Sequence, residues 1–493
     1  MYFKRQGFPL LRKICLFYFL EDSMRKTKIV CTIGPACSNP ATLEKMVLAG
    51  MNVARLNFSH GTHDDHKYRI ELIKSVRAKL NMPVGILLDT KGPEYRIGIF
   101  ENGSVDLEQG DEFTFTAEDV LGDKNRVSVS YKKLAEELYV GDTVLVNNGL
   151  MIFQVKRIEG SDVVCETLNS GRLSDRKSMS FPNKVLKSDY LSEQDKADIL
   201  FGLEHGVDFI ACSFVSCVED LKLVREFIEE NGNHDVSLIA KIENRSGIDN
   251  IESICEECEG IMIGRGDMGV EIPYEELPAI QKKLITKCRL LGKRVITATE
   301  MLESMITNPR PTRAEISDVA NAVYDGSSAI MLSGETAAGK YPVESVSAMA
   351  RIAEHTEKTI HYEKRFRNTE FKIKNTLDAT SHAVCGLAID IDAKAIVVCS
   401  LSGTTTRMVS RFRSPVDILG LTVSEKTLNK LTMSWGVRPL LCDRYPSVEV
   451  LFYRAKQYAK ETLGLKPGDK IIITGGNTDG RSGNTDLIKI ETI

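Results

Sequence analysis

Polar and charged residues of this chain stand where short apolar runs end. Arg55, Asn57 and Ser59 alternate along one run, which puts all three on one face of a strand, and His60 follows directly. Five further runs end in such clusters: Asp89-Thr90 followed by Lys91-Gly92-Pro93-Glu94-Tyr95-Arg96, Lys241 with Glu243, Gly264-Arg265-Gly266-Asp267, Thr299, and Ser333-Gly334-Glu335-Thr336. Each cluster alone has an ordinary explanation, because a Lys-x-Glu pair is usually a solvated ion pair and Arg-Gly-Asp is a common turn. Their repetition at one strand end after another favours a single chemical site.

The oxygen-bearing residues divide into two candidate cation sites. Glu243 and Asp267 offer carboxylate oxygens that suit Mg²⁺ or Mn²⁺, and Mg²⁺ keeps several waters and shares its other positions with substrate oxygens. A second set provides amide, hydroxyl and carboxylate oxygens with one formal negative charge: Asn57, Ser59, Asp89 and Thr90. That set suits a monovalent cation such as K⁺.

Three cationic side chains, Arg55, Arg96 and Lys241, accompany these oxygens and would neutralise phosphoryl oxygens. The glycines before Asp267 would let backbone N–H groups approach a substrate carboxylate, helped by the positive end of the helix that follows. Because phosphoryl transfer depends on positioning and charge stabilisation, the whole constellation favours that reaction.

Two other motifs favour structural roles. Gly334–Lys340 fits G-x-x-x-x-G-K, but Tyr341 replaces the Ser or Thr that would hold Mg²⁺ and Pro342 follows, so we expect no P-loop. Cys255 and Cys258 form a lone C-x-x-C without a second pair or a His at zinc spacing, which indicates a helix with two thiols.

The elements that must position the site alternate in a βαβ rhythm, with runs rich in Val and Ile separated by longer amphipathic stretches. The eight runs are Lys28-Ile33, Asn52-Phe58, Val84-Leu88, Val207-Phe214, Ser237-Ile242, Gly260-Ile263, Arg294-Ala298 and Ser328-Leu332. Eight parallel strands with intervening helices predict an α/β fold, a closed (β/α)₈ or TIM barrel, in which function concentrates at the carboxyl ends of the strands.

Two parts of the chain interrupt or follow this rhythm. After the third run come roughly a hundred residues with alternating strand patterns and turn signals, which predict an inserted small β domain. After the eighth run, the polar segment Lys358-Lys374 precedes further strand-like runs, which predict a separate open α/β domain. The expected division is an extension at 1–23, the barrel at 24–91 and 190–357, the inserted domain at 92–189 and the C-terminal domain at 358–493.

Composition excludes several classes of protein. With 42% hydrophobic and 27% charged residues among 493, the chain matches a soluble globular protein and not a disordered, collagen-like or polytopic membrane protein. The net charge of −4 lacks the basic excess of a nucleic-acid binder, so we expect small ligands and no nucleic-acid partner. Twelve cysteines are too sparse for a disulfide scaffold and indicate reduced thiols in the cytoplasm. Within residues 1–23, basic residues precede a short apolar run from Ile14 to Leu20, a pattern that resembles a signal peptide. No small-residue cleavage site follows, and the run is far too short to span a bilayer as a helix, so we expect an upstream extension and neither secretion nor membrane attachment.

Taken in order, these residues resemble the pyruvate kinase family. The motifs that carry the resemblance are Cys31-Thr32-Ile33-Gly34-Pro35-Ala36, the segment from Asn52 to Gly61, Leu88-Asp89-Thr90-Lys91-Gly92-Pro93-Glu94, Lys241-Ile242-Glu243-Asn244, Met301-Leu302-Glu303-Ser304-Met305 and the segment from Asn308 to Glu315. The resemblance covers the chain from Met24 to Ile493. It implies that the inserted domain is a β-barrel lid over the nucleotide, that the C-terminal domain serves regulation and subunit contacts, and that the protein is a homotetramer.

The resemblance also implies the reaction phosphoenolpyruvate + ADP + H⁺ → pyruvate + ATP, with Mg²⁺ and K⁺. Lys241 would stabilise the transferring phosphoryl group, and Thr299 would assist protonation of the enolate carbon through water. By resemblance the substrate is held by Arg55, Lys241, Gly266, Asp267 and Thr299; Mg²⁺ by Glu243 and Asp267; K⁺ by Asn57, Ser59, Asp89 and Thr90; and the nucleotide by Asn57, Phe58, Ser59, His60, Arg96 and Lys177.

The chain departs from the family pattern mostly in the lid. Where the family usually has Asp-Asp-Gly, this chain has Asn147-Asn148-Gly149, and where the family has a Gly-Val-Asn-Leu-Pro-Gly-like segment, it has Ser178-Met179-Ser180-Phe181-Pro182-Asn183. In addition, Ser216 replaces a common Arg and Glu300 replaces a common Gln. These changes bear on lid closure and nucleotide affinity, including the Lys177 assignment, more than on phosphoryl transfer.

Two other functions fit parts of the pattern. A catalytically weak paralogue that binds phosphoenolpyruvate or sugar phosphates as a sensor would explain the altered lid, but the retained Lys241, Glu243, Asp267 and Thr299 argue against it. A barrel lyase or aldolase acting on pyruvate enolates with Mg²⁺ would need neither the lid nor the potassium-type ligands.

A loop of the C-terminal domain suggests regulation. Ser402, Gly403, Thr404 and Thr405 follow the run Ala395-Cys399 and open a helix, so hydroxyls and N–H groups converge where a phosphate would sit. An ordinary Ser/Thr-rich helix cap explains this spacing equally well.

The loop also resembles the phosphate-binding effector loop of allosteric pyruvate kinases, with the segment from Gly475 to Gly483 able to close over it. Leu451 stands where members activated by fructose 1,6-bisphosphate carry Arg. We therefore expect activation by a phosphorylated metabolite, a monophosphate and not the bisphosphate.

Overall fold

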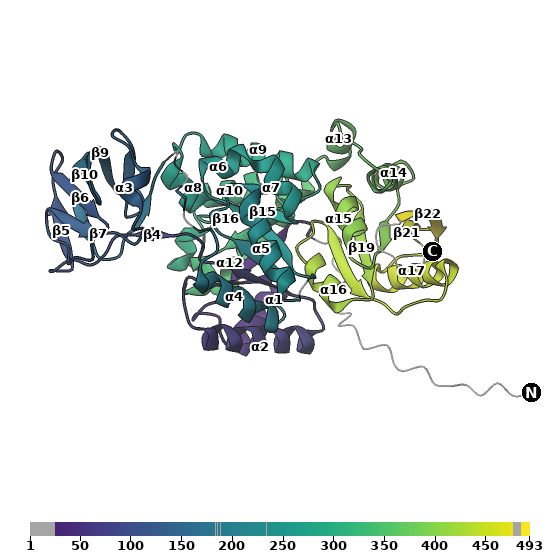
Figure 1. Ribbon diagram of the computed structural model, residues 1–493. Helices are drawn as coiled ribbons and strands as arrows, with labels where there is room; N and C mark the ends of the chain where they lie inside the picture. The colour runs from purple at the N-terminus through teal and green to yellow at the C-terminus, as the bar shows by residue number, and fades with distance from the viewer. Residues whose placement is uncertain (1–24, 183, 185, 188, 233, 477–484) are drawn as a thin grey trace, which may run out of the picture.

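The computed structural model describes residues 25–476 and 485–493, apart from 183, 185, 188 and 233. Three bodies lie in a row, with the inserted β domain at one side, the barrel in the centre and the C-terminal domain at the other side (Figure 1). The expected extension at 1–23 lies outside the described residues. Of the helices in the described part of the chain, none is both long and apolar enough to cross a membrane.

Eight parallel strands close the central barrel. In the order in which they pair around the ring, they are β1 (Lys28–Thr32), β2 (Val53–Asn57), β3 (Gly85–Asp89), β13 (Phe209–Cys212), β14 (Ser237–Ile242), β15 (Gly260–Gly264), β16 (Arg294–Ala298) and β17 (Ala329–Leu332). Each predicted run is a strand whose ends agree within two residues. The runs are continuously apolar because these strands are buried on both faces.

Helices surround the barrel and begin at the capping residues of the sequence. The helical segments are α1 (Pro40–Leu48), α2 (His63–Leu80), α4 (Glu193–Glu204), α5 (Val218–Glu230), α6 (Arg245–Asp249), α7 (Ile251–Glu257), α8 (Arg265–Glu271), α9 (Leu277–Leu290), the 3₁₀ turn η2 (Glu303–Ile306), α10 (Arg313–Asp325), α11 (Gly334–Ala337) and α12 (Pro342–Lys358). Thr62 with Asp65, and Thr312 with Glu315, form capping boxes that fix where α2 and α10 begin.

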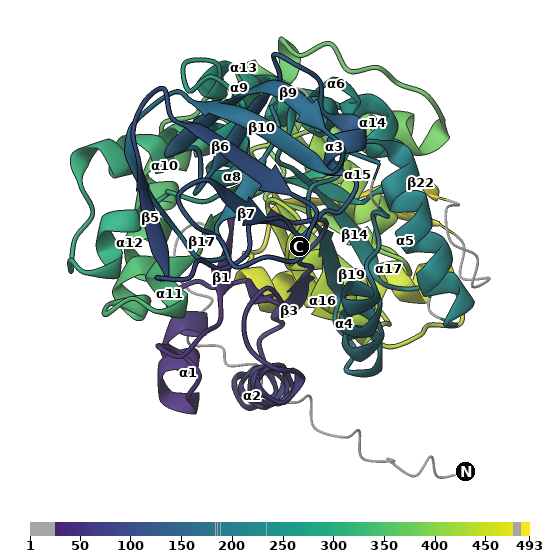
Figure 2. The same ribbon diagram turned by 60° about the vertical axis from the view of Figure 1, so that its left-hand side comes forward.

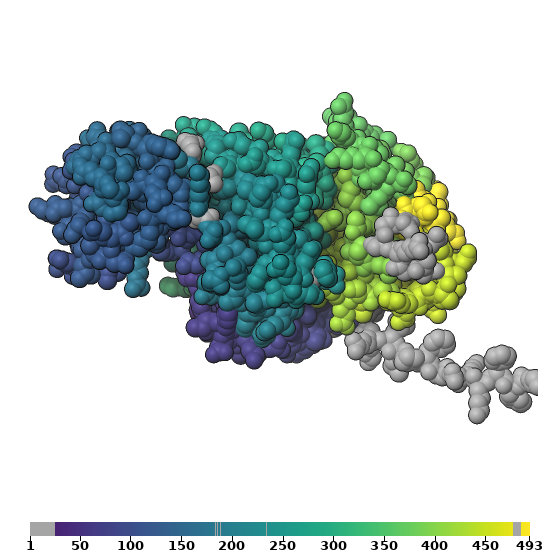
Figure 3. Space-filling model, viewed as in Figure 1, coloured from purple at the N-terminus to yellow at the C-terminus, as the bar shows by residue number. Residues whose placement is uncertain are grey.

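The inserted domain, which we call the lid, is built on two sheets. The larger sheet has the order β4 (Tyr95–Arg96), β12 (Ser178–Ser180), β8 (Thr143–Val146), β9 (Met151–Glu159), β10 (Asp162–Thr167), β6 (Glu112–Thr116) and β7 (Arg126–Ser128), and the smaller pairs β11 (Gly171–Ser174) with β5 (Ser104–Leu107). A short helix, α3 (Leu134–Glu137), lies in the same domain. Both sheets share a core around Phe113, Phe115 and Phe153. In the space-filling view the lid forms a lobe of its own (Figure 3).

The C-terminal domain is an open sheet with helices around it, as predicted. Its sheet has the order β20 (Val437–Leu441), β19 (Asp417–Thr422), β18 (Ala395–Cys399), β21 (Lys470–Gly476) and β22 (Thr485–Thr492), with only β22 antiparallel to its neighbour among the described strands. Its helices are α13 (Tyr362–Arg367), α14 (Thr376–Asp390), α15 (Thr404–Arg411), α16 (Glu425–Leu431) and α17 (Val448–Leu463).

The C-terminal domain is docked on the amino ends of the barrel strands. Lys28 Nζ donates to the Val437 carbonyl at 2.8 Å, and Arg294 Nε donates to Ser434 Oγ at 3.2 Å. Met433 belongs to the apolar cluster that fills the inside of the barrel, so the C-terminal domain also closes that end. In Figure 2 the lid strands lie in front of the barrel and the C-terminal domain behind it. The carboxyl ends of the strands therefore face the lid.

Candidate active site

Arg55 and Asp89 form a buried ion pair at the carboxyl ends of β2 and β3. Arg55 Nε lies 2.6 Å from Asp89 Oδ2, and Arg55 Nη1 donates to Thr32 Oγ1 at 2.9 Å. Burial by itself would raise the pKa of Asp89, but the Arg55 guanidinium and the Lys241 ammonium outweigh it and hold that pKa below its usual range. Asp89 is therefore a carboxylate, and it fixes the orientation of Arg55.

The Lys241 ammonium is held at three points. Its Nζ lies 3.1 Å from Asp89 Oδ1 and 3.1 Å from Glu243 Oε1, and it donates to Ser213 Oγ at 2.7 Å. Burial alone would lower the pKa of Lys241, yet the two carboxylates raise it above its ordinary value. The site therefore contains a fixed, permanently positive charge that is only 8% exposed.

Ser213 joins these groups, although the sequence analysis did not select it. Besides accepting from Lys241, its hydroxyl donates to the Thr90 carbonyl at 2.7 Å and lies 3.3 Å from Asp89 Oδ1. Ser213 directly follows β13, the strand formed by the fourth apolar run, so it lies at a strand end like the residues predicted for the site. It was missed because Cys212 and Phe214 make the run appear uninterrupted.

Glu243 and Asp267 come from the ends of neighbouring strands, β14 and β15. Glu243 Oε2 accepts from the Phe214 N–H at 2.9 Å, and a Cβ placed on Gly264 would lie 2.6 Å from Glu243 Oε1. The carboxylate therefore packs against the backbone where α8 begins, and Asp267 follows on the exposed side of that first turn. Burial raises the pKa of Glu243 to about 7; Lys241 lowers it and the nearby Asp267 charge raises it again. A cation between the two carboxylates would relieve this crowding of negative charge.

The backbone after β16 is strained. Thr299 has φ +67° and Glu300 has φ +53°, a left-handed conformation that a β-branched residue rarely adopts. The Thr299 hydroxyl donates to the Ala298 carbonyl at 2.6 Å and accepts from the Gly266 N–H at 2.8 Å. This conformation fixes the hydroxyl directly beside the first turn of α8.

Arg265 holds the strained segment in place. Its Nη2 donates to the Thr299 carbonyl at 2.6 Å and to the Glu300 carbonyl at 3.1 Å, and it pairs with Asp318 Oδ2 on α10 at 2.8 Å. In the sequence, Arg265 is recognisable only as part of an Arg-Gly-Asp turn. These contacts could not be predicted from the sequence, because Asp318 on α10 and the 299–300 segment come close to Arg265 only when the barrel has formed.

Replacing Arg265 with lysine should loosen this segment, because one ammonium cannot reach both carbonyls and Asp318 together. We expect kcat to fall by about 10- to 100-fold, since small displacements of a reacting group are costly, while the KM for the acidic substrate changes less. Steady-state kinetics with a thermal melt measure this. Arg351→Lys, at an exposed position of α12, is the matched control. An unchanged kcat in Arg265→Lys would remove the positioning role.

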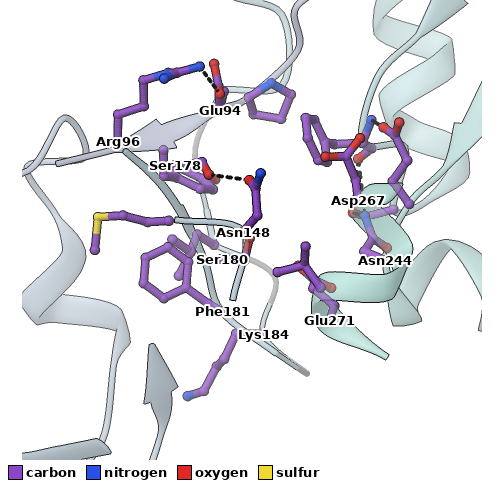
Figure 4. Close-up of a pocket in the computed structure, with 18 of the residues that line it drawn as sticks. Glu94, Arg96, Asn148, Ser178, Ser180, Phe181, Lys184, Asn244, Asp267 and Glu271 are labelled. Carbon is purple, nitrogen blue, oxygen red and sulfur yellow. Dashed lines mark hydrogen bonds and ion pairs between the residues drawn. The ribbon is translucent and has the colours of Figure 1, made fainter. Parts of the chain in front are cut away.

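A cavity of about 370 Å³ opens between the lid and the barrel. Figure 4 shows its two sides facing each other, with Arg96, Ser178 and Phe181 on the lid and Asn244, Asp267 and Glu271 on the barrel. Lys177 and Glu243 also line it. The structure thus brings Arg96 and Lys177, about 80 residues apart in the chain, to the same cavity as the two carboxylates. Arg96 forms an ion pair with Glu94 there.

The four residues predicted to hold a monovalent cation lie at one corner of the barrel. Asn57 and Asp89 are register partners on β2 and β3, and Thr90 follows. Asn57 Oδ1 accepts from the Ser59 N–H at 3.2 Å, which folds the chain back over the strand end. The two strand ends therefore bring together a set of oxygens that are far apart in the sequence.

The loop after β2 separates its residues into two environments. Ser59 and His60 are exposed, whereas the Phe58 ring is 8% exposed and stacks on His66 with ring centroids 3.9 Å apart. The ring also packs against Phe201, so it belongs to the helix layer. The Phe58 side chain is thus occupied in packing, in contrast to the exposed Ser59 and His60.

The two motifs expected to be structural make internal contacts. In Gly334–Lys340, both carboxylate oxygens of Glu335 accept backbone N–H groups, so the loop is closed by its own side chain. Cys255 and Cys258 are buried free thiols, and Cys255 Sγ lies 3.6 Å from Cys288 Sγ. Among the described residues, no group of three or more His, Cys, Asp or Glu side chains is arranged to hold a metal ion.

Barrel and site define a class of enzyme. Fixed positive charge, two adjacent carboxylates and a helix start lie under a cavity that a separate lobe covers, which is the arrangement expected of a (β/α)₈-barrel phosphotransferase. The family model "Pyruvate kinase, barrel domain" matches residues 24–346, and "Pyruvate kinase, alpha/beta domain" matches residues 378–491. The chain belongs to the pyruvate kinase family, whose members transfer the phosphoryl group of phosphoenolpyruvate to ADP in glycolysis.

Individual relatives agree with the family models. The chain is 43% identical over 472 residues to a pyruvate kinase of Clostridium acetobutylicum, covering 95% of this chain and 100% of that protein. It is 46% identical over 473 residues to one of Staphylococcus aureus, covering 95% of this chain and 81% of that protein. Its structure resembles the crystal structure of a pyruvate kinase from Cryptosporidium parvum, with a TM-score of 0.91, 38% identity and 98% of each chain covered.

Proposed function

We propose that phosphoenolpyruvate binds at the carboxyl end of the barrel, between Arg55, Lys241 and the first turn of α8, and that ADP binds in the cavity below the lid. The observation that supports this most directly is the buried Lys241 ammonium held by Asp89, Ser213 and Glu243. A coupled assay with phosphoenolpyruvate, ADP, Mg²⁺ and K⁺ tests the proposal. Negligible ATP formation would favour a sensor that binds the substrate without turning it over.

Each residue then has a separate task. Arg55 neutralises phosphoryl oxygens, and Lys241 presents a compact, fixed positive charge to the phosphoryl group as it moves to ADP. The Gly266 N–H and the Thr299 hydroxyl lie side by side, where a substrate carboxylate can replace their mutual hydrogen bond. Thr299 then assists protonation of the enolate carbon through water: the hydroxyl relays a proton that comes from solvent, and it ends the step with its own proton restored.

A divalent cation fits Glu243 and Asp267. Burial and the charge of Asp267 both raise the pKa of Glu243, so a cation between the two carboxylates would stabilise their charged forms. Mg²⁺ or Mn²⁺ suits the pair, because two protein carboxylates leave other coordination positions of the ion for substrate oxygens and water. When bound, the ion would neutralise charge on enolate and phosphoryl oxygens. For the nucleotide, Arg96, Lys177 and the exposed Ser59 and His60 are the proposed contacts.

The corner formed by Asn57, Ser59, Asp89 and Thr90 is the proposed K⁺ site. By resemblance to the family, a lysine at the position of Glu94 could substitute for the ion. In this chain the residue is a carboxylate, which pairs with Arg96 and lies 4.0 Å from Lys91 Nζ, so the position supplies no positive charge in place of K⁺.

Activity should therefore depend on K⁺. We expect turnover to fall by at least about tenfold when K⁺ is replaced by a bulky organic cation at equal ionic strength, because the oxygens of this corner then lack their counter-charge. The coupled assay measures this, with KCl added back as the control. Full turnover without K⁺ would contradict the proposed site.

The loop 402–405 is the proposed effector site. Gly403 is the N-cap of α15 with φ +77° and makes no side-chain cap, while Ser402 Oγ lies 3.0 Å from Thr404 Oγ1. Because glycine has no side chain, the N-cap residue gives the N–H groups at the start of α15 no hydrogen bond, and a phosphate could accept from them. Thr405 is buried and shares a hydrogen bond with Thr485. Most of the segment expected to close over the loop, Gly475–Gly483, lies outside the described residues.

If the loop binds a phosphate monoester, we expect the ester to activate the enzyme by lowering the phosphoenolpyruvate concentration that gives half saturation. We expect Thr404→Glu to abolish the shift, because a carboxylate at the helix start repels the phosphate. Titration of sugar monophosphates, AMP and fructose 1,6-bisphosphate against the substrate saturation curve measures it. If no compound shifts the wild-type curve, or the variant keeps the shift, the loop is a structural turn.

The family membership also supports a homotetramer acting in the cytoplasm. Light scattering on the purified protein and fractionation of cells that express it test these two points.

A further inference from the structure

The turn formed by Ser213 and Phe214 contacts two charged groups of the proposed catalytic site. The Ser213 hydroxyl accepts from Lys241 Nζ at 2.7 Å, and the Phe214 N–H donates to Glu243 Oε2 at 2.9 Å. Two consecutive residues thus hold the buried ammonium and one of the two carboxylates proposed to bind the metal. A displacement of this turn would therefore disturb both groups together.

The backbone of this turn is strained. Phe214 has φ +56°, a left-handed conformation that a residue with a bulky side chain rarely adopts. Such a conformation persists only where the surrounding structure holds it. The contacts that other elements make with this turn therefore bear directly on the geometry of the site.

Tyr190 makes one of these contacts. It lies where the chain returns from the lid to the barrel, between β12 and α4, and its hydroxyl donates to the Ser213 carbonyl at 2.8 Å. Burial raises the pKa of Tyr190 above its ordinary value, so the phenol stays protonated and remains a donor. Because Ser213 is only 1% exposed, water has little access to replace this hydrogen bond.

Gly92 contacts the same turn from the other connection to the lid, between β3 and β4. It has φ +70°, and a Cβ placed on it would lie 2.8 Å from Ser213 Cβ and 3.0 Å from the Ser213 carbonyl oxygen. A side chain here would therefore push on the turn, and glycine avoids both that clash and the backbone strain. Both connections between the barrel and the lid thus meet at Ser213.

One carboxylate on α4 fastens these two connections to each other. Asp195 Oδ1 accepts from the N–H groups of Lys91 and Gly92 at 3.1 Å and 3.2 Å. Its other oxygen, Oδ2, accepts from Ser192 Oγ at 2.6 Å, and the side chain is 1% exposed. The Tyr190 hydroxyl is thus presented from an anchored segment, as the support of a reacting group must be.

We propose that Tyr190 is a positioning residue for phosphoryl transfer and acts through the turn at 213–214. Through that turn its hydroxyl keeps Lys241 and Glu243 in the geometry that the reaction needs, an assignment that rests on the proposed function of those two residues. Tyr190 also lines the cavity below the lid, but its hydroxyl is engaged by the Ser213 carbonyl and is not directed to a nucleotide. Loss of the hydroxyl should therefore affect turnover and metal binding more than nucleotide binding.

Tyr190→Phe in the full-length protein tests the proposal, because it removes the hydroxyl and keeps the ring. We expect kcat for ATP formation to fall by about 10- to 100-fold, since small displacements of reacting groups are costly, and the KM for ADP to change by less than about threefold. Binding of Mn²⁺ without substrates, followed by its paramagnetic signal, should weaken at least about threefold through the disturbed support of Glu243. Tyr445→Phe is the matched control, because that hydroxyl shares a hydrogen bond with Tyr458 in the C-terminal domain.

A double-mutant cycle shows whether Tyr190 acts through the turn. Ser213→Ala removes the hydroxyl that Lys241 contacts, so the further change Tyr190→Phe should then lower kcat by a smaller factor than it does in the wild type. Equal factors in the two backgrounds would overturn the proposal, because independent residues have additive effects.

Three further results would overturn it: an unchanged kcat in Tyr190→Phe, a change confined to the KM for ADP, or an equal loss of kcat in Tyr445→Phe. Melting curves show whether Tyr190→Phe folds. If it does not, Gly92→Ala pushes on the same turn from the other connection and should lower kcat and Mn²⁺ affinity together, and a loss of neither would contradict the proposal. Wild-type ATP formation is measured first and Mn²⁺ binding needs no turnover, so failure of the proposed reaction is distinguishable from failure of this assignment.

Discussion

Replacing Lys241 with methionine is expected to lower kcat for ATP formation by roughly 10³- to 10⁵-fold, the range for loss of a cation that stabilises phosphoryl transfer. Lys241 presents a fixed ammonium to the group that moves, and methionine has similar length but no charge. Asp89 keeps its partner Arg55 in the variant, so the base of the site stays paired. Exchange of the pyruvate methyl protons should survive, because that step belongs to the Thr299 side of the site.

Two activities are therefore measured on one variant, by the coupled assay for ATP and by NMR for exchange of the methyl protons into D₂O. Lys282→Met, an exposed lysine on α9 that pairs with Asp325, controls for the substitution itself. If Lys241→Met loses both activities to the same extent, transfer and protonation are not divided between Lys241 and Thr299.

Replacing Asp267 with asparagine should have the second largest effect, through the divalent cation. The change removes one of two carboxylates and keeps the shape, so we expect the Mg²⁺ concentration for half-maximal activity to rise at least about tenfold and kcat to fall about 100-fold. Chelation of divalent ions should abolish wild-type turnover.

Binding of Mn²⁺, followed by its paramagnetic signal in the absence of substrates, gives a readout independent of turnover. The matched control is Glu275→Gln, because Glu275 is an exposed carboxylate eight residues further along the chain. An unchanged Mn²⁺ affinity together with an unchanged Mg²⁺ requirement in Asp267→Asn would show that the cation is held elsewhere.

The two ends of the barrel strands make different contacts. Thr299, Lys241 and Asp89 stand at the carboxyl ends, under the lid, while Arg294 stands at an amino end, against the C-terminal domain. Met433 from that domain packs inside the barrel itself. The same strands thus carry the catalytic groups at one end and contact the C-terminal domain at the other.

The sequence by itself determined the barrel and most of its chemical residues. Strands buried on both faces must be continuous apolar runs, and the carboxyl ends of parallel strands meet at one end of a barrel. Arg55, Lys241 and Thr299 could therefore be assigned to one site from their positions at strand ends alone. The capping boxes at Thr62 and Thr312 act within four residues, so the starts of α2 and α10 are determined by local sequence.

Only the tertiary structure decided the contacts between distant parts of the chain. Ser213 meets Asp89 across 124 residues, and Arg265 reaches the 299–300 carbonyls across 34 or 35. Periodicity and capping describe interactions between near neighbours in sequence, whereas burial, ion pairing and strain at these residues arise when separate elements pack against one another.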